Sequence, residues 1–169
     1  AMLQGINVIG VDVDKNATEN AKKNIEWLKK SYPINSRAIV INKNSKESVS
    51  VIIPSYNEGK RITSVLNALV KTKILKEIIV VDDGSTDNTE KIAREFATKY
   101  KKVRYIKNKK NMGKAYSMDK GVQAANSEII FFCDADLIGL TPKIVEGIIT
   151  PVLNKEFDMF IGVRSNVMQ

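Results

Sequence analysis

Short apolar runs and longer amphipathic stretches alternate along this sequence from residue 49 onward. Each apolar run stops at a polar break, and this pattern predicts buried parallel strands at 51–53, 78–81, 103–106, 129–133 and 159–163. In the stretches between them, apolar residues recur every three or four positions, as Ile62, Val65 and Leu69 do, which predicts helices with one buried face. Strands that alternate with helices predict an α/β fold in which right-handed crossovers join the strands of a parallel sheet.

The ends of two of these helices carry signals of their own. Asp87 and Glu90 have the spacing of a capping box at the start of the second helix. Thr141 is predicted to cap a later helix whose first residue is Pro142. Pro151 is predicted to end or restart that helix, with the preceding threonine as the new cap.

The first part of the chain predicts a separate β-α-β unit, with its elements at 7–13, 17–30 and 37–42. The polar stretch from Asn42 to Ser48 contains no large apolar residue and is predicted to be a domain boundary. We therefore expect an appendage over residues 1–47 and a main domain over residues 48–169.

Polar residues follow three of the predicted strands at the point where each strand ends. They are Pro54 to Glu58 after the first strand of the main domain, Asp82 and Asp83 after the second, and Asp134 to Asp136 after the fourth. In a sheet of order 3-2-1-4 these three strands are neighbours, and a ligand crevice opens beyond their carboxyl ends. The sequence thus predicts one polar rim.

Asp134 and Asp136 are one residue apart, and two carboxylates that close repel each other unless a cation or hydrogen-bond donors are present. A divalent metal that holds a diphosphate meets this need, and oxygen ligands suit Mg²⁺ or Mn²⁺. Taken alone, the triplet favours a pair of solvated loop aspartates, or an aspartate that caps the next helix, because Asp-x-Asp is common. The shared rim favours the metal.

Composition narrows the partners and excludes several chemistries. The net charge of +8 favours anionic partners such as phosphates or an anionic membrane surface, and the basic residues between Lys101 and Lys110 are predicted to form a solvated face. Aromatic residues make up only 7% and do not interleave with that run, so nucleic acid is not expected. With no histidine, imidazole catalysis is excluded. The single cysteine, Cys133, is predicted to be a small core residue in a reducing, cytoplasmic compartment.

Three segments of the main domain carry a family resemblance. Val49 to Glu58, Ile78 to Thr89 and the Asp134-Ala135-Asp136 cluster resemble family 2 glycosyltransferases of the GT-A fold. The pattern is also similar to that of polyprenyl-phosphate sugar synthases and glucosyl-3-phosphoglycerate synthases. The resemblance covers about residues 48–164 and implies a Rossmann-like (GT-A) parallel sheet with helices on both faces.

The resemblance also implies roles for single residues in binding a nucleotide-diphosphate sugar. Pro54 and Tyr56 would pack against the base and ribose, and Glu58 would accept a hydrogen bond from either. Asp83 would accept a base donor, while Asp82 and Gly84 shape the turn.

The phosphate and metal roles fall on later residues. Gly113 and Lys114 precede a helix and form either an anion site or a flexible glycine before a solvated lysine. Asp134 and Asp136 would be the metal pair, with Asp136 the more direct ligand of Mg²⁺ or Mn²⁺. Arg164 is predicted to reach a phosphate.

The function implied is metal-dependent transfer of a sugar from a nucleotide-diphosphate sugar to an acceptor. One alternative is a non-catalytic nucleotide-sugar-binding module, or an inactive donor-half fragment, with the same crevice. A nucleotidyltransferase would need a glycine- and arginine-rich loop where this chain has Tyr56-Asn57-Glu58. A methyltransferase fragment is the last alternative, because the N-terminal β-α-β unit resembles the middle of a Rossmann-type methyltransferase without its glycine-rich loop.

Members of the resembled family continue into an acceptor-binding half with an acidic base, so this chain resembles the donor-binding half alone. Glu146, Glu156 and Asp158 are predicted away from the crevice, and no catalytic residue is assigned. We therefore expect slow transfer at most, and self-association through exposed apolar surface. The acceptor is unassigned; a lipid phosphate or a small phosphorylated acid fits the basic charge, as does peripheral contact with the inner face of a membrane.

Overall fold

The computed structural model describes residues 7–12, 48–155 and 160–163 of the chain. The helix predicted at 17–30, the strand predicted at 37–42 and the side chain of Arg164 lie outside the described residues. Most of the predicted boundary before residue 48 lies outside them as well.

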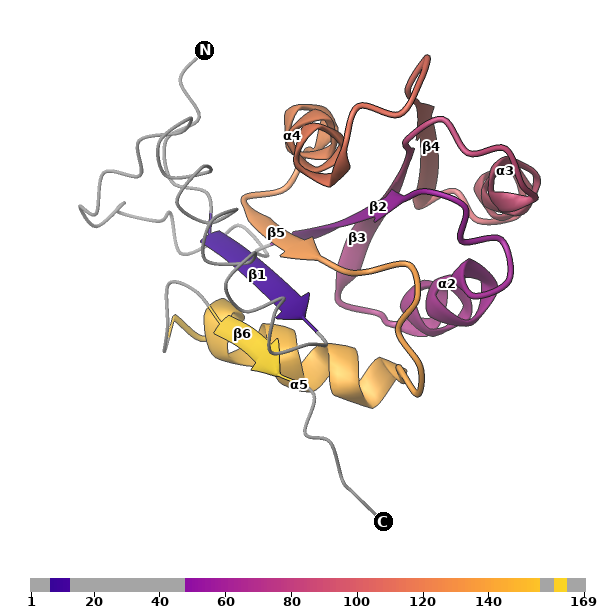
Figure 1. The fold of residues 1–169 in the computed structure, drawn as a ribbon. Coiled ribbons are helices and arrows are strands. Elements are labelled where there is room, and N and C mark those ends of the chain that lie inside the picture. The colour runs from indigo at the N-terminus through magenta and orange to yellow at the C-terminus, as the bar shows by residue number, and fades with distance from the viewer. Residues whose placement is uncertain (1–6, 13–47, 156–159, 164–169) are drawn as a thin grey trace.

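The described strands form one parallel sheet of six strands in the order β4-β3-β2-β5-β1-β6 (Figure 1). Their bounds are β1 Asn7–Asp12, β2 Val49–Ser55, β3 Leu75–Asp82, β4 Val103–Lys107, β5 Ile129–Phe132 and β6 Phe160–Val163. The stretch β4-β3-β2-β5 confirms the order predicted for the main domain. It places β2 at the centre, between β3 and β5, where their carboxyl ends share one rim.

β1 lies inside this sheet and pairs with β5 on one side and β6 on the other. The strand predicted at residues 7–13 is therefore confirmed, and the sheet continues past β5 through a strand from the N-terminal part of the chain. The division into an appendage and a main domain at residue 48 stays a prediction.

Helices cover both faces of the sheet, as predicted (Figure 1). The alternating side chains of the strands separate into two buried clusters, which accounts for the runs of consecutive apolar residues within the strands. One cluster, including Val51 and Phe131, packs against α2 (Ile62–Lys71), α3 (Thr89–Lys99) and α5 (Pro142–Leu153). The other, including Ile52 and Phe132, packs against α4 (Lys114–Ala124) through Met118.

Cys133 belongs to the first cluster and is fully buried. Burial raises the pKa of its thiol above the usual value, so the thiolate that a nucleophile needs is disfavoured. The prediction of a small core residue is confirmed.

Strand β2 does not stop at Pro54, as its sequence suggested, but continues to Ser55. β2 pairs with β5 only from Val49 to Ile52, so Pro54 has a neighbouring strand on one side alone, where it lies opposite Val81. A proline that lacks an amide hydrogen is tolerated there because its position behaves like that of an edge strand.

Two predictions about helix ends are wrong, and one is confirmed. Thr141 caps α5, its hydroxyl accepting the amide of Ile144 at 3.3 Å, with a proline as first residue. However, α5 continues through Pro151 to Leu153, because buried residues on both sides of the proline keep that helix face against the core. The Asn154 amide donates to the Thr150 carbonyl at 2.8 Å, across the proline.

The capping box predicted for α3 does not form. Its N-cap residue is Asn88, whose side chain makes no capping hydrogen bond. Glu90 instead forms ion pairs with Arg94, at 2.9 Å, and with Lys107. The Glu90 carboxylate therefore pairs with basic residues on α3 and β4 instead of capping the helix.

Glu77 is a buried acid near the amino end of β3, on the rim opposite the polar clusters. Its carboxylate accepts the Ser50 hydroxyl at 2.6 Å and Arg104 Nη1 at 2.9 Å, and it also accepts the amide of Asn126. Burial by itself raises the pKa of Glu77, but these hydrogen bonds outweigh it and hold the pKa below its usual value. The carboxylate thus ties β2, β4 and the segment between α4 and β5 to β3.

We predict that Glu77→Gln lowers the free energy of unfolding by about 2 kcal/mol at neutral pH, because the buried network loses its negative charge and an amide donor replaces one acceptor oxygen. A depressed pKa in the folded state stabilises the fold above the unfolded value and loses that contribution as the pH falls through the folded value. The variant should therefore lose less stability in acid than the parent. Urea unfolding at about pH 7 and about pH 3.5 tests both points, with the exposed Glu95→Gln as control. Equal losses for the two variants would contradict the prediction.

Candidate functional site

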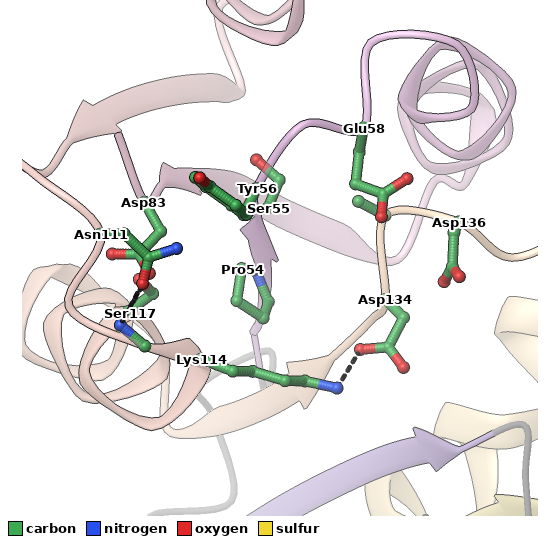
Figure 2. Close-up of a pocket in the computed structure, with 12 residues that line it drawn as sticks. Pro54, Ser55, Tyr56, Glu58, Asp83, Asn111, Lys114, Ser117, Asp134 and Asp136 are labelled. Atoms are coloured by element: carbon green, nitrogen blue, oxygen red, sulfur yellow. Dashed lines mark hydrogen bonds and ion pairs between the residues drawn. The ribbon is translucent and has the colours of Figure 1, made fainter. Parts of the chain in front are cut away.

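One cavity of about 350 Å³ lies at the carboxyl ends of β2, β3 and β5 (Figure 2). It is lined by eight residues predicted for the site: Pro54, Tyr56, Glu58, Asp83, Gly113, Lys114, Asp134 and Asp136. Four further lining residues were not predicted: Ser55, Asn111, Ser117 and Ala135. Asn111 and Ser117 lie close in sequence to Gly113 and Lys114, which were predicted for the site. No pattern in the sequence indicated that their side chains also reach the cavity.

The loop after β2 is held by the loop after β3. Asn57 has a positive φ of 56°, which asparagine tolerates, and its side-chain oxygen accepts the amide of Thr86 at 2.9 Å. The Glu58 amide donates to the Thr89 hydroxyl at 2.9 Å, and the next amide donates to Asp87 at 3.0 Å. These bonds fix Tyr56 and Glu58 beside the cavity without any contact from a ligand.

Asp82 and Gly84 shape the turn after β3, as predicted. Asp82 accepts the Ser85 amide at 2.8 Å and the Tyr105 hydroxyl at 2.6 Å. Burial and this bond to a carboxylate raise the pKa of Tyr105 above its usual value, which keeps the phenol protonated as the donor. Gly84 has a φ of 77°, and a Cβ there would lie 2.9 Å from the carbonyl carbon of Lys110. Only glycine fits this turn.

Asp83 is buried, with 3% of its surface exposed, and its carboxylate already has three donors. It accepts the amide of Met112 at 2.9 Å, the amide of Gly113 at 2.7 Å and the side-chain amide of Asn108 at 2.7 Å. Gly113 makes this possible because its φ of 95° turns the chain into α4. The carboxylate thus fastens the loop before α4 to β3, a role that sequence reasoning did not find. Its predicted contact with a base stays a prediction.

Three further acids gather at the other side of the cavity (Figure 2). Ala135 and Leu137 belong to the buried core cluster, whereas the alternate residues Asp134 and Asp136 are partly exposed and line the cavity with their carboxylates. Lys114 Nζ lies 2.8 Å from Asp134 Oδ1 and joins α4 to the loop after β5. The Asp-x-Asp spacing thus places both carboxylates on one side of the chain.

Glu58 shares this acidic side with Asp136, and a basic residue lies between them. Arg61 Nε is 2.9 Å from Glu58 Oε2, and Arg61 Nη1 is 3.8 Å from Asp136 Oδ2. Burial raises the pKa of Glu58; Arg61 opposes this rise, and the charge of Asp136 adds to it. Arg61 was not singled out from the sequence, where it looked like one of many basic helix residues.

The family follows from a comparison with known sequences. Residues 50–168 match the profile of Glycosyl transferase family 2. The chain belongs to this family. It is 34% identical over 117 residues to the uncharacterized glycosyltransferase YibD of Escherichia coli (strain K12), a match that covers 69% of this chain and 33% of YibD. The family 2 chain described here thus spans about a third of the length of that relative.

Solved structures confirm the GT-A fold class. The mannosyltransferase PcManGT from Pyrobaculum calidifontis, in complex with GDP-Man and Mn²⁺, superposes with a TM-score of 0.58 at 23% identity, over 80% of this chain and 41% of that one. Glucosyl-3-phosphoglycerate synthase from Mycobacterium tuberculosis, in complex with Mn²⁺, UDP and glucosyl-3-phosphoglycerate, gives a TM-score of 0.54 at 25% identity, over 70% and 46%. The family 2 domain therefore has the architecture that its sequence implied.

Asp134 and Asp136 of the family 2 domain fit a metal ion that takes most of its ligands from water and substrate rather than from protein side chains. Among the described residues no three acidic, histidine or cysteine side chains are grouped closely enough to enclose an ion. Asp134 and Asp136 supply hard oxygen atoms on one side of the cavity. Mg²⁺ is commonly bound in this way, through one or two carboxylates, with water and substrate phosphates as the other ligands.

The basic residues between Lys101 and Lys110 were predicted to form a solvated face, but several of them contact other parts of the family 2 domain. Lys102 donates to the Thr72 carbonyl at 2.8 Å, while Arg104 and Lys107 pair with acids on β3 and α3. Contact with an anionic surface stays a prediction. Within the described part of the chain, each helix is too short or too polar to cross a membrane.

We predict that Asp83→Ala lowers the free energy of unfolding by about 2–3 kcal/mol, because two backbone amides and one side-chain amide lose their acceptor. Chemical denaturation measures this loss, and Asp119→Ala on the surface of α4 is the control, with a change within about 0.5 kcal/mol. If Asp83 served only as a contact for the base, Asp83→Ala would change stability little. Unchanged stability combined with weaker nucleotide binding would return Asp83 to a purely ligand-binding role.

Proposed function

We propose that this family 2 domain binds a nucleotide-diphosphate sugar together with Mg²⁺ or Mn²⁺ and that the protein transfers the sugar to an acceptor. The observation that carries the proposal is the convergence of eight predicted residues on one cavity at the carboxyl ends of β2, β3 and β5. In open parallel sheets, ligands bind in the crevice at this edge.

The base and ribose would lie at the side of the cavity formed by Pro54, Tyr56 and Asp83 (Figure 2). Tyr56 is 46% exposed, so its ring is available for contact with a flat ligand without a change in the core. The amides of Met112 and Gly113 donate to Asp83, and these hydrogen bonds fix the loop that closes this side of the cavity.

The diphosphate would lie between Lys114 and the acids Asp134 and Asp136. Lys114 already spans the cavity to Asp134 and brings positive charge to its floor (Figure 2). A metal ion held by Asp134 and Asp136 would neutralise the charge that develops on the departing nucleoside diphosphate. The complex of the M. tuberculosis synthase with Mn²⁺ and UDP supports this choice of metal and nucleotide.

The acceptor site lacks an assigned base among the described residues. Glu146 lies on α5 and does not line the cavity, and Glu156 and Asp158 lie outside the described residues. We propose an acceptor of the phosphorylated class, either a lipid phosphate or a small phosphorylated acid. The glucosyl-3-phosphoglycerate in the M. tuberculosis complex supports the second.

Removing Asp136 tests the metal assignment. We expect Mn²⁺ to strengthen UDP or GDP binding by the parent chain, and Asp136→Ala to weaken that metal-dependent gain roughly tenfold, which corresponds to about 1.4 kcal/mol. Isothermal titration of each nucleotide, with Mn²⁺ and with chelator, measures the gain.

The matched control is Asp119→Ala, which removes a carboxylate from α4 outside the cavity. It should bind like the parent. Nucleotide affinities that are the same with metal and with chelator would refute a metal-dependent donor site. Sugar transfer from UDP- or GDP-sugars to lipid phosphate and to phosphoglycerate then separates a transferase from a module that only binds.

A further inference from the structure

Arg61 is a basic side chain placed beside the acids of the proposed metal site. It connects two loops, since Glu58 follows β2 and Asp136 follows β5. The guanidinium forms a close ion pair with Glu58, at 2.9 Å, and a longer one with Asp136, at 3.8 Å. It therefore occupies part of the space in which a cation near Asp136 would have to bind.

The backbone holds Arg61 in this place. Its amide and the amide of Ile62 both donate to the Glu58 carbonyl at 2.9 Å, which forms the turn that begins α2. The base of the Arg61 side chain is therefore fixed beside Glu58 whatever lies in the cavity. Movement of the guanidinium requires only rotation of the side chain.

The guanidinium is easily displaced. The Arg61 side chain is 54% exposed and that of Asp136 is 44% exposed, and ion pairs with this exposure contribute little to stability. When a cation takes Asp136, Arg61 can turn toward solvent without leaving a buried charge unpaired. Because the backbone of Arg61 stays fixed beside Glu58, its positive charge remains near the acids and still repels the ion.

We propose that Arg61 opposes binding of the metal ion alone and thereby couples metal binding to nucleotide binding. This inference rests on the proposed function, because it takes Asp136 as a ligand of the metal. The diphosphate adds negative charge beside the ion, and this charge offsets Arg61. Linkage then requires that nucleotide and metal each raise the affinity of the other, and part of that coupling comes from Arg61.

The experiment titrates Mn²⁺ into the purified chain and follows free Mn²⁺ by electron paramagnetic resonance, first without nucleotide and then with saturating UDP. Arg61→Gln should bind Mn²⁺ alone roughly 3–10-fold more tightly than the parent at low salt. With UDP present the difference should shrink. Arg61→Lys keeps the charge and should stay close to the parent.

Lys60→Gln is the matched control. Lys60 is exposed and precedes Arg61 in the chain, so its substitution removes the same positive charge one position away. It accounts for the general effect of net charge on Mn²⁺ affinity. Thermal unfolding of each variant checks that the fold is retained. A gain for Arg61→Gln well above that for Lys60→Gln supports the proposal.

Equal gains for the two glutamine variants, or weaker Mn²⁺ binding by Arg61→Gln, would overturn the role of Arg61. Asp136→Ala, measured alongside, separates this failure from that of the proposed function. If Asp136→Ala binds Mn²⁺ as tightly as the parent, the metal assignment itself is wrong, and the inference about Arg61 fails with it.

Discussion

The parallel pairing of β2 between β3 and β5 is the constraint on which the site depends. Backbone hydrogen bonds set β2 in register with both neighbours, so that the three strands end at the same rim. Because β5 is short and pairs with β2 only as far as Ile52, a gap opens beside Pro54 and Ser55. The cavity lies at this gap, lined by residues from all three strand ends.

The loops around the cavity are connected to one another by hydrogen bonds from backbone amides to side chains. Asp87 and Thr89 bind the amides of the loop after β2, and Asp83 binds the amides before α4. Each of these carboxylates or hydroxyls satisfies backbone donors that would otherwise need water. The backbone of the loops that line the cavity is therefore held in place before any ligand arrives.

Charge balance is the second feature of the site. The cavity brings together four acids, which are matched in three ways: Asp83 by amides, Asp134 by Lys114, and Glu58 and Asp136 both by Arg61. Burial of a carboxylate without such partners would be costly. The buried acid Glu77 follows the same rule on the opposite rim, where its partners are structural.

The sequence by itself determined the α/β class and the eight candidate residues of the cavity, and the strand order that it assumed from β4 to β5 is the one observed. It could do so because the buried parallel strands contain runs of consecutive apolar residues and polar residues follow where three of the strands end. It misjudged Pro54, Glu90 and Pro151, because local propensity does not reveal a missing neighbour strand, a competing ion-pair partner or a buried helix face. Only the tertiary structure decided that Asp83 fastens a loop, that Arg61 lies between two acids and that β1 joins the sheet. These contacts join residues far apart in the chain or depend on side-chain direction, and neither periodicity nor spacing encodes them.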